Sequence, residues 1–152
     1  MISTTHATHN NAALLIAPGF SESEVVFCLS KIRSAGFPIS LIGLSNNLIH
    51  SQHGLAVRPD FSLNQIPHNV SFRLLIIPGS YECVTNLLTS PDFHQQIKKS
   101  IEQQGDIAIL NEAATALQQA KLFTEQSEYI LRQDDQPLES FCQQLLQSKA
   151  IT

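Results

Sequence analysis

The residues with the clearest chemical potential lie between Gly105 and Leu117, where a short apolar run ends at Leu110 and an alanine-rich run begins at Glu112. The first run predicts a buried strand and the second a helix, with no loop between them. Such a turn presents one side chain beside the unpaired N–H groups of the helix start, where hydrolases of several folds carry a nucleophile. That side chain is Asn111, which is not a nucleophile. The sequence therefore predicts the geometry of a catalytic site around an inert residue.

Asn111 has two interpretations. Its amide could hydrogen-bond a ligand, or it could satisfy buried backbone groups at the turn, and we favour the second.

Glu24 also has two interpretations. It lies three residues after Ser21 at the start of an expected helix, so the pair could form a capping box. Its carboxyl group could instead face a pocket. Capping boxes are the commoner arrangement, so we favour the cap, although both roles could hold together.

The three cysteines are an odd number at wide spacing, which fits neither a disulfide framework nor a zinc site, so we expect reduced thiols. Cys28 and Cys142 lie on apolar faces of expected helices, so we interpret them as packing residues. Cys83 lies four residues after Gly79 and is a candidate for a relocated catalytic thiol. A cysteine without a nearby histidine is ordinarily unreactive, so we expect Cys83 to be inert.

Two histidine pairs share the same spacing, His6 with His9 and His50 with His53. A metal site would need a third ligand, which the sequence does not indicate, so we expect surface histidines and no metal. No glycine-rich phosphate-binding motif occurs, so we expect no nucleotide and no other cofactor.

Alternating strand and helix signals position these residues and predict an α/β fold around a mostly parallel sheet. Residues 12–17 and 72–77 are apolar runs that end in Pro-Gly, which is typical of central strands. Ile39 to Leu44 is a further strand, a hairpin surrounds residues 51–54, and residues 59–63 form a loop or one helical turn. Ser90-Pro91-Asp92 begins a helix with Phe93, Ile97 and Ile101 on one face. Helices are also expected at 21–36, 82–88, from Glu112 and from Pro137, with one strand at 129–131.

The chain has 152 residues, of which 43% are hydrophobic, enough for one domain. We expect a loose N-terminal tail at residues 1–11 and a single domain at 12–152. The net charge of −4, with nine unclustered Lys and Arg, argues against nucleic acid as a partner. No window has the apolar length or flanking charge of a membrane span or leader, so we expect a cytoplasmic protein with no membrane partner.

Residues 12 to 123 resemble the ThiJ/PfpI superfamily, which includes the parkinsonism-associated deglycase-like proteins and the PfpI peptidases. The matching strings, in chain order, are Ala-Pro-Gly followed by Glu24, Ser-Ala-Gly-Phe-Pro-Ile, Val-Arg-Pro-Asp-Phe-Ser-Leu, Ile-Ile-Pro-Gly-Ser and the strand-to-helix turn at Asn111. The resemblance implies a flavodoxin-like three-layer sandwich, related to the class I glutamine amidotransferases. The family's Thr-X-His-Pro strand has no match, and residues 121–136 are short. The resemblance therefore implies a domain shortened near its C-terminus, without the family's histidine.

In that family a cysteine lies at the turn, a glutamate hydrogen-bonds it, and backbone N–H groups after the Pro-Gly strand help form an oxyanion hole. Carried over by residue, Glu24 matches the glutamate, and Gly79 and Ser80 match a usual Gly-Gly pair. Asn111 replaces the cysteine, so neither acyl transfer nor sulfenic-acid sensing can use this position. Glu112 also adds negative charge where an oxyanion would form.

These observations favour a catalytically inactive family member that acts as a binding, regulatory or assembly module through a pocket at Glu24, Gly79, Ser80 and Asn111. The alternative is a hydrolase, lyase or deglycase-like enzyme that uses Glu24 or Cys83. A third possibility, a small-ligand sensor, is suggested by family members fused to DNA-binding domains. We expect a homodimer or another protein partner, because the family commonly dimerises and the shortening after Phe123 would uncover apolar surface.

Overall fold

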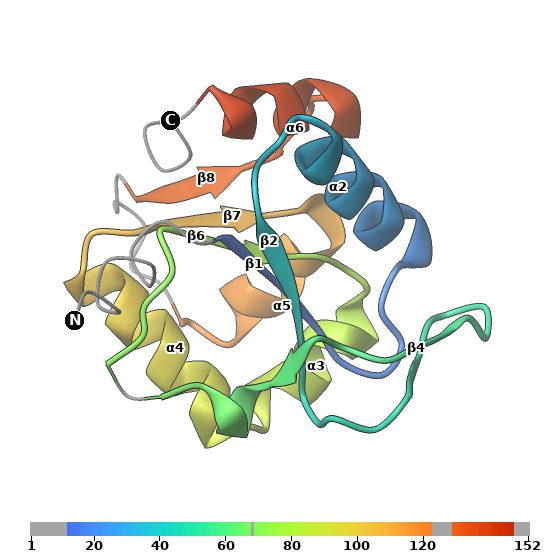
Figure 1. Ribbon diagram of the computed structural model, residues 1–152, viewed down its shortest axis with the longest axis vertical. Coiled ribbons are helices and arrows are strands. Elements are labelled where there is room, and N and C mark those ends of the chain that lie inside the picture. Colours follow the sequence, from blue (N-terminus) through green and yellow to red (C-terminus); the bar gives the residue numbers. More distant parts are fainter. Residues whose placement is uncertain (1–11, 68, 123–128, 148–152) are drawn as a thin grey trace.

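A six-stranded sheet runs through the centre of the molecule (Figure 1). The computed structural model describes residues 12–67, 69–122 and 129–147, so the expected tail at 1–11, with His6 and His9, lies outside the described part. The strand order is β5-β2-β1-β6-β7-β8, and all five pairings are parallel. The bounds are β1 Ala12–Ile16, β2 Ile39–Gly43, β5 Phe61–Ser62, β6 Leu74–Ile77, β7 Asp106–Ile109 and β8 Ile130–Arg132.

The inner strands are apolar along their whole length because both faces of the sheet are covered. Every residue of β1, β6 and β7 is buried. Leu14, in the middle of β1, pairs with Leu41 on one side and Ile76 on the other. A parallel strand between two helical layers needs this continuous apolar pattern, in place of the alternation of a half-exposed strand.

Helices form a layer on each face of the sheet, which confirms the three-layer α/β fold (Figure 1). Two helices pack against each other on one face, α2 (Glu22–Ser34) and α6 (Leu138–Leu146). Three lie on the other face: α3 (Tyr81–Leu88), α4 (Pro91–Glu102) and α5 (Asn111–Gln119). No helix of residues 12–67, 69–122 and 129–147 is both long and apolar enough to cross a membrane.

Several local predictions are confirmed. The Oγ atom of Ser90 accepts a hydrogen bond from the backbone N–H of Phe93 (3.3 Å), and Pro91 lies in the first turn of α4. The expected hairpin is the antiparallel pair β3 (Ile49–His50) and β4 (Ala56–Val57).

One prediction is wrong. Residues 59–63 are not only a loop or helical turn, because Phe61–Ser62 forms the edge strand β5 before the short 3-10 helix η1 (Leu63–Gln65). Asp60 fixes this pairing: its carboxylate accepts a hydrogen bond from the backbone N–H of Leu41 (2.8 Å). Phe93, Ile97 and Ile101 lie one above another along α4, as expected. The buried part of this face ends before Ile101, which is 38% exposed.

Candidate functional site

The strand-to-helix turn lies at the carboxyl edge of the sheet, as the sequence predicts. Strand β7 ends at Ile109, buried Leu110 caps the helix, and α5 begins at Asn111. The Asn111 residue is exposed, and its backbone N–H donates a hydrogen bond to Oε1 of Gln133 (3.1 Å). Among the described residues, no hydrogen bond of the Asn111 amide group to a buried backbone group is present. The interpretation of Asn111 as a side chain that satisfies buried backbone groups is therefore not supported within the part of the chain that the structure describes.

Glu24 does not cap its own helix, so the favoured capping-box interpretation is wrong. Ser21 occupies the N-cap position of α2, but its side chain accepts no capping hydrogen bond. The Glu24 side chain instead reaches another segment, where its Oε1 accepts a hydrogen bond from the backbone N–H of Gly79 (2.7 Å). The Gly79 carbonyl in turn accepts a hydrogen bond from the backbone N–H of Ser21 (2.9 Å). Both polar groups of the Gly79 backbone are thus engaged by the start of α2.

The environment of Glu24 makes its carboxyl group a weaker acid than that of an exposed glutamate. Burial raises the pKa of the Glu24 carboxyl group, and the nearby negative charge of Glu112 raises it further, while the hydrogen bond from Gly79 opposes both effects. A carboxyl group with this balance binds a proton more readily than an exposed glutamate does. Perturbed carboxyl groups of this kind are common at functional sites.

Glu112 lies directly over Gly79, where an oxyanion would have to form. A Cβ atom added to Gly79 would lie 2.6 Å from Cβ of Glu112, 2.9 Å from its Oε1 and 3.2 Å from Oε1 of Glu24. Only glycine fits this space without displacing its neighbours. Two carboxyl groups therefore lie against the backbone that would stabilise negative charge in a hydrolase, and like charges repel an anion there.

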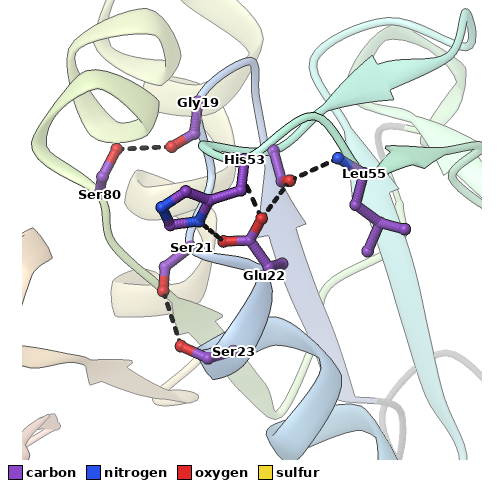
Figure 2. A network of polar contacts seen from close by, with 8 residues as sticks. Gly19, Ser21, Glu22, Ser23, His53, Leu55 and Ser80 are labelled. Carbon is purple, nitrogen blue, oxygen red and sulfur yellow. Dashed lines mark hydrogen bonds and ion pairs between the residues drawn. The ribbon is translucent and has the colours of Figure 1, made fainter.

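Ser80, which directly follows Gly79, has a structural function. Its side chain is buried, and its Oγ donates a hydrogen bond to the Gly19 carbonyl (2.6 Å; Figure 2). The same Oγ accepts a hydrogen bond from the backbone N–H of Cys83 (3.4 Å), which caps α3. The Ser80 hydroxyl is therefore occupied by the protein itself.

Cys83 lacks the properties of a reactive thiol. It is 0% exposed, and burial raises the pKa of its thiol to about 12. Because the thiolate is the reactive form, a thiol with this pKa is almost entirely unreactive at neutral pH.

The structure also contains a polar network that the sequence does not indicate (Figure 2). The Glu22 carboxylate accepts hydrogen bonds from Oγ of Ser51 (2.5 Å) and the backbone N–H of His53 (3.1 Å), and it lies 2.8 Å from Nδ1 of the His53 ring. Oγ of Ser51 also accepts a hydrogen bond from the backbone N–H of Leu55 (2.9 Å). These contacts, with Ser51 first and His53 second, lower the pKa of Glu22 to about 2.

This network is not a Ser-His-Glu nucleophile triad. Ser51 donates to the Glu22 carboxylate and not to the histidine, so no base is placed to remove the serine proton. The network instead fastens the turn between β3 and β4 to the start of α2. No sequence signal could have found it, because Glu22 and Ser51 are 29 residues apart. Among the residues that the structure describes, no three His, Cys, Asp or Glu side chains are grouped so that they could hold a metal ion.

Comparison with known proteins agrees with this fold. The model of the DJ-1/PfpI family matches residues 10–128. Among curated relatives, the Parkinson disease protein 7 homolog of Danio rerio is 26% identical over 107 residues, which are 70% of this chain and 57% of that protein. The chain thus spans less than two thirds of that relative's length.

Two solved structures have closely similar folds. Drosophila melanogaster DJ-1beta superposes with a TM-score of 0.80 at 18% identity, covering 95% of this chain and 92% of its own. A DJ-1 superfamily protein from Salmonella typhimurium superposes with a TM-score of 0.76 at 18% identity, covering 90% of this chain and 88% of its own. At this level of identity the likeness establishes the fold, and the family match confirms the resemblance indicated by the sequence.

Proposed function

The chain belongs to the DJ-1/PfpI family, and we propose that it acts there as a binding protein without cysteine-based catalysis. Its ligand or partner occupies the corner formed by Glu24, Gly79, Ser80 and Asn111. The observation that carries this proposal is the exposed Asn111 at the first position of α5. A carboxamide there can donate and accept hydrogen bonds but cannot form a covalent intermediate.

The surroundings of Asn111 support one class of ligand. Glu24 and Glu112 both lie against Gly79, and Glu24 already uses the Gly79 N–H. A neutral hydrogen-bond donor or an ammonium group would be attracted by these carboxyl groups, whereas a carboxylate or phosphate would be repelled. The corner is therefore suited to a ligand with donor groups.

Thermal unfolding in the presence of ethylammonium and of propionate tests this preference. We expect ethylammonium to raise the unfolding temperature of the wild-type chain and propionate to have no such effect. The double variant Glu24→Gln, Glu112→Gln should lose the response to ethylammonium. Stabilisation by propionate, or an equal response of the double variant, would contradict the proposed ligand class.

A second candidate function is an enzyme that uses Glu24 as a general acid or base. The raised pKa of Glu24 favours it, because a carboxyl group that titrates closer to neutral pH transfers protons more effectively. Methylglyoxal consumption provides the test, since an aldehyde is a suitable substrate for a deglycase-like enzyme. We expect the wild-type chain to match Glu24→Gln at every pH. A rate above that of Glu24→Gln, with an inflection in the carboxyl range, would instead establish the enzyme.

We also propose that a second copy of the chain is a partner, as the resemblance to the family suggests. The reason based on the C-terminal shortening is not supported, since no large apolar side chain in residues 129–147 is strongly exposed. The strongly exposed ones in the described part come earlier: Val26, Leu48, Leu55, Phe61, Tyr81 and Ile101. Light scattering at micromolar concentration should give the mass of a dimer, and a strictly monomeric particle would contradict this.

A further inference from the structure

Two cysteines that lie far apart in the sequence are in direct contact. Sγ of Cys28 lies 3.5 Å from Sγ of Cys142, although 114 residues separate them. Cys28 comes from α2 and Cys142 from α6, the two helices that pack together on one face of the sheet (Figure 1). Neither side chain is exposed. Because both sulfurs lie in the interface between these helices, a bond between them would join the C-terminal helix covalently to the first helix.

The two thiols are surrounded by buried apolar side chains of both helices. Val25 and Ile32 of α2 are buried on the same side as Cys28, and Phe141 and Leu145 of α6 are buried beside Cys142. At the rim of the same interface, Nζ of Lys31 lies 3.8 Å from the Glu139 carboxylate. The sulfur contact therefore belongs to an extended interface, and a bond would shorten the distance between the two sulfurs from 3.5 Å to about 2.05 Å.

Either thiol can donate the hydrogen bond between the two sulfurs. Burial disfavours the thiolate form of both cysteines, whereas the charge of Lys31 favours the thiolate of Cys142. Either sulfur can therefore react first, and the other is placed to react with it in a second step.

We propose that Cys28 and Cys142 form a reversible disulfide that fastens α6 to α2 when the protein meets hydrogen peroxide. One of the two thiols loses its proton, its sulfur attacks one peroxide oxygen, and the O–O bond breaks to leave a sulfenic acid, while the departing hydroxide takes up that proton and becomes water. The sulfur of the other cysteine then attacks the sulfenic sulfur, the S–O bond breaks, and a second water leaves with the proton of that cysteine. Two thiols and one peroxide become one disulfide and two waters, so the sulfurs are oxidised and the peroxide oxygens are reduced.

Cys83 serves as an internal control. It is also fully buried, but it lies in α3 on the opposite face of the sheet and is in hydrogen-bond contact with neither other thiol.

Because all three thiols are shielded from solvent, peroxide can reach the pair only when α6 moves away from α2. The reaction should therefore be slow in buffer and faster in urea below the unfolding transition.

The test uses the full chain, reduced and then treated with a small excess of hydrogen peroxide. Before alkylation, we expect the intact mass of the oxidised chain to be lower by two hydrogen atoms. After unfolding and alkylation, we expect only one thiol to be alkylated. Digestion should then give a cross-linked peptide that contains Cys28 and Cys142. Dithiothreitol should restore all three thiols. Three remaining thiols, a bond that includes Cys83, or sulfinic acid without a cross-link would each overturn the proposal.

Unfolding in urea supplies an independent measurement. The oxidised wild-type chain should unfold at a higher urea concentration than the reduced chain, because the bond closes a long loop in the unfolded state. Cys83→Ser should keep this shift, whereas Cys28→Ala and Cys142→Ala should lose it. An equal shift in Cys28→Ala would contradict the bond, and the peptide mapping of the wild-type chain remains decisive if an alanine variant does not fold.

Discussion

Oε1 of Glu24 lies 2.7 Å from the backbone nitrogen of Gly79, and this hydrogen bond joins the first turn of α2 to the segment that follows β6. In a hydrolase with this corner, the Gly79 N–H would be directed at the substrate. Here it is occupied by a carboxyl group from the protein itself. The same bond that organises the corner therefore removes one donor from any oxyanion hole.

Replacing Glu24 with alanine should destabilise the protein more than replacing it with glutamine. Alanine leaves the buried Gly79 N–H without an acceptor, which costs about 1–3 kcal/mol. Glutamine keeps an acceptor oxygen and carries no charge. Urea unfolding at pH 7 measures both variants, and equal losses would show that the hydrogen bond contributes nothing.

The stability difference between wild type and Glu24→Gln should also depend on pH. The pKa of Glu24 is raised in the folded state, so protonation of this carboxyl group contributes stability to the fold. That contribution is complete below the ordinary value of 4.5 and is lost as the pH rises through the folded pKa. The wild-type chain should therefore lose stability relative to Glu24→Gln above pH 4.5. A difference that is constant with pH would contradict the raised pKa.

Asn111→Cys should add one thiol that reacts rapidly with an alkylating probe. The three natural cysteines are fully buried, so the wild-type chain should be labelled roughly tenfold more slowly or worse. Adding Glu112→Ala should speed the new thiol further, because removing a neighbouring negative charge favours the thiolate. Asn111→Ser is the matched control. Labelling of Asn111→Cys at the wild-type rate would mean that position 111 does not lie at an open corner.

Glu22→Gln should destabilise the protein at neutral pH, and the loss should shrink in acid. The pKa of Glu22 is lowered to about 2 by Ser51 and His53, so the carboxylate stabilises the fold above the ordinary value of 4.5. This contribution is lost as the pH falls from 4.5 toward 2. Thermal unfolding between pH 7 and 2.5 measures it. The exposed Glu102→Gln is the control, and a loss that stays the same at pH 2.5 would contradict the network.

Gly79→Ala should be strongly coupled to residue 112. The added Cβ would lie 2.6 Å from Cβ of Glu112, and such overpacking costs about 1–3 kcal/mol. In a Glu112→Gly background part of that cost should disappear, with a coupling of about 0.5–3 kcal/mol. Gly105→Ala is the control, because its Cβ would meet the Phe72 carbonyl at 2.6 Å instead. Additive effects of Gly79→Ala and Glu112→Gly would exclude the close contact.

Most of the fold could be predicted because the signals are local. The apolar runs of β1 and β6 end in Pro-Gly, Ser90 and Pro91 start α4, and the strand-to-helix turn at Asn111 is legible from its own residues. The edge strand β5 could not be predicted in this way. Its two residues pair with β2, and the contact of Asp60 with Leu41 that supports this pairing spans 19 residues.

The sequence alone determined that an amide, and not a thiol, lies at the turn before α5. The tertiary structure decided which distant groups come into contact. The Glu24 carboxyl group accepts a hydrogen bond from Gly79 and does not cap its own helix, and Glu112 lies against the same glycine. The sulfur atoms of Cys28 and Cys142 also come into contact. The reason is physical. Apolar periodicity and turn chemistry depend on neighbours in the chain, so they can be read in order along it. A carboxyl group can accept a hydrogen bond from its own helix or from a distant backbone N–H. Which of the two bonds forms depends on whether the folded sheet brings that N–H within reach.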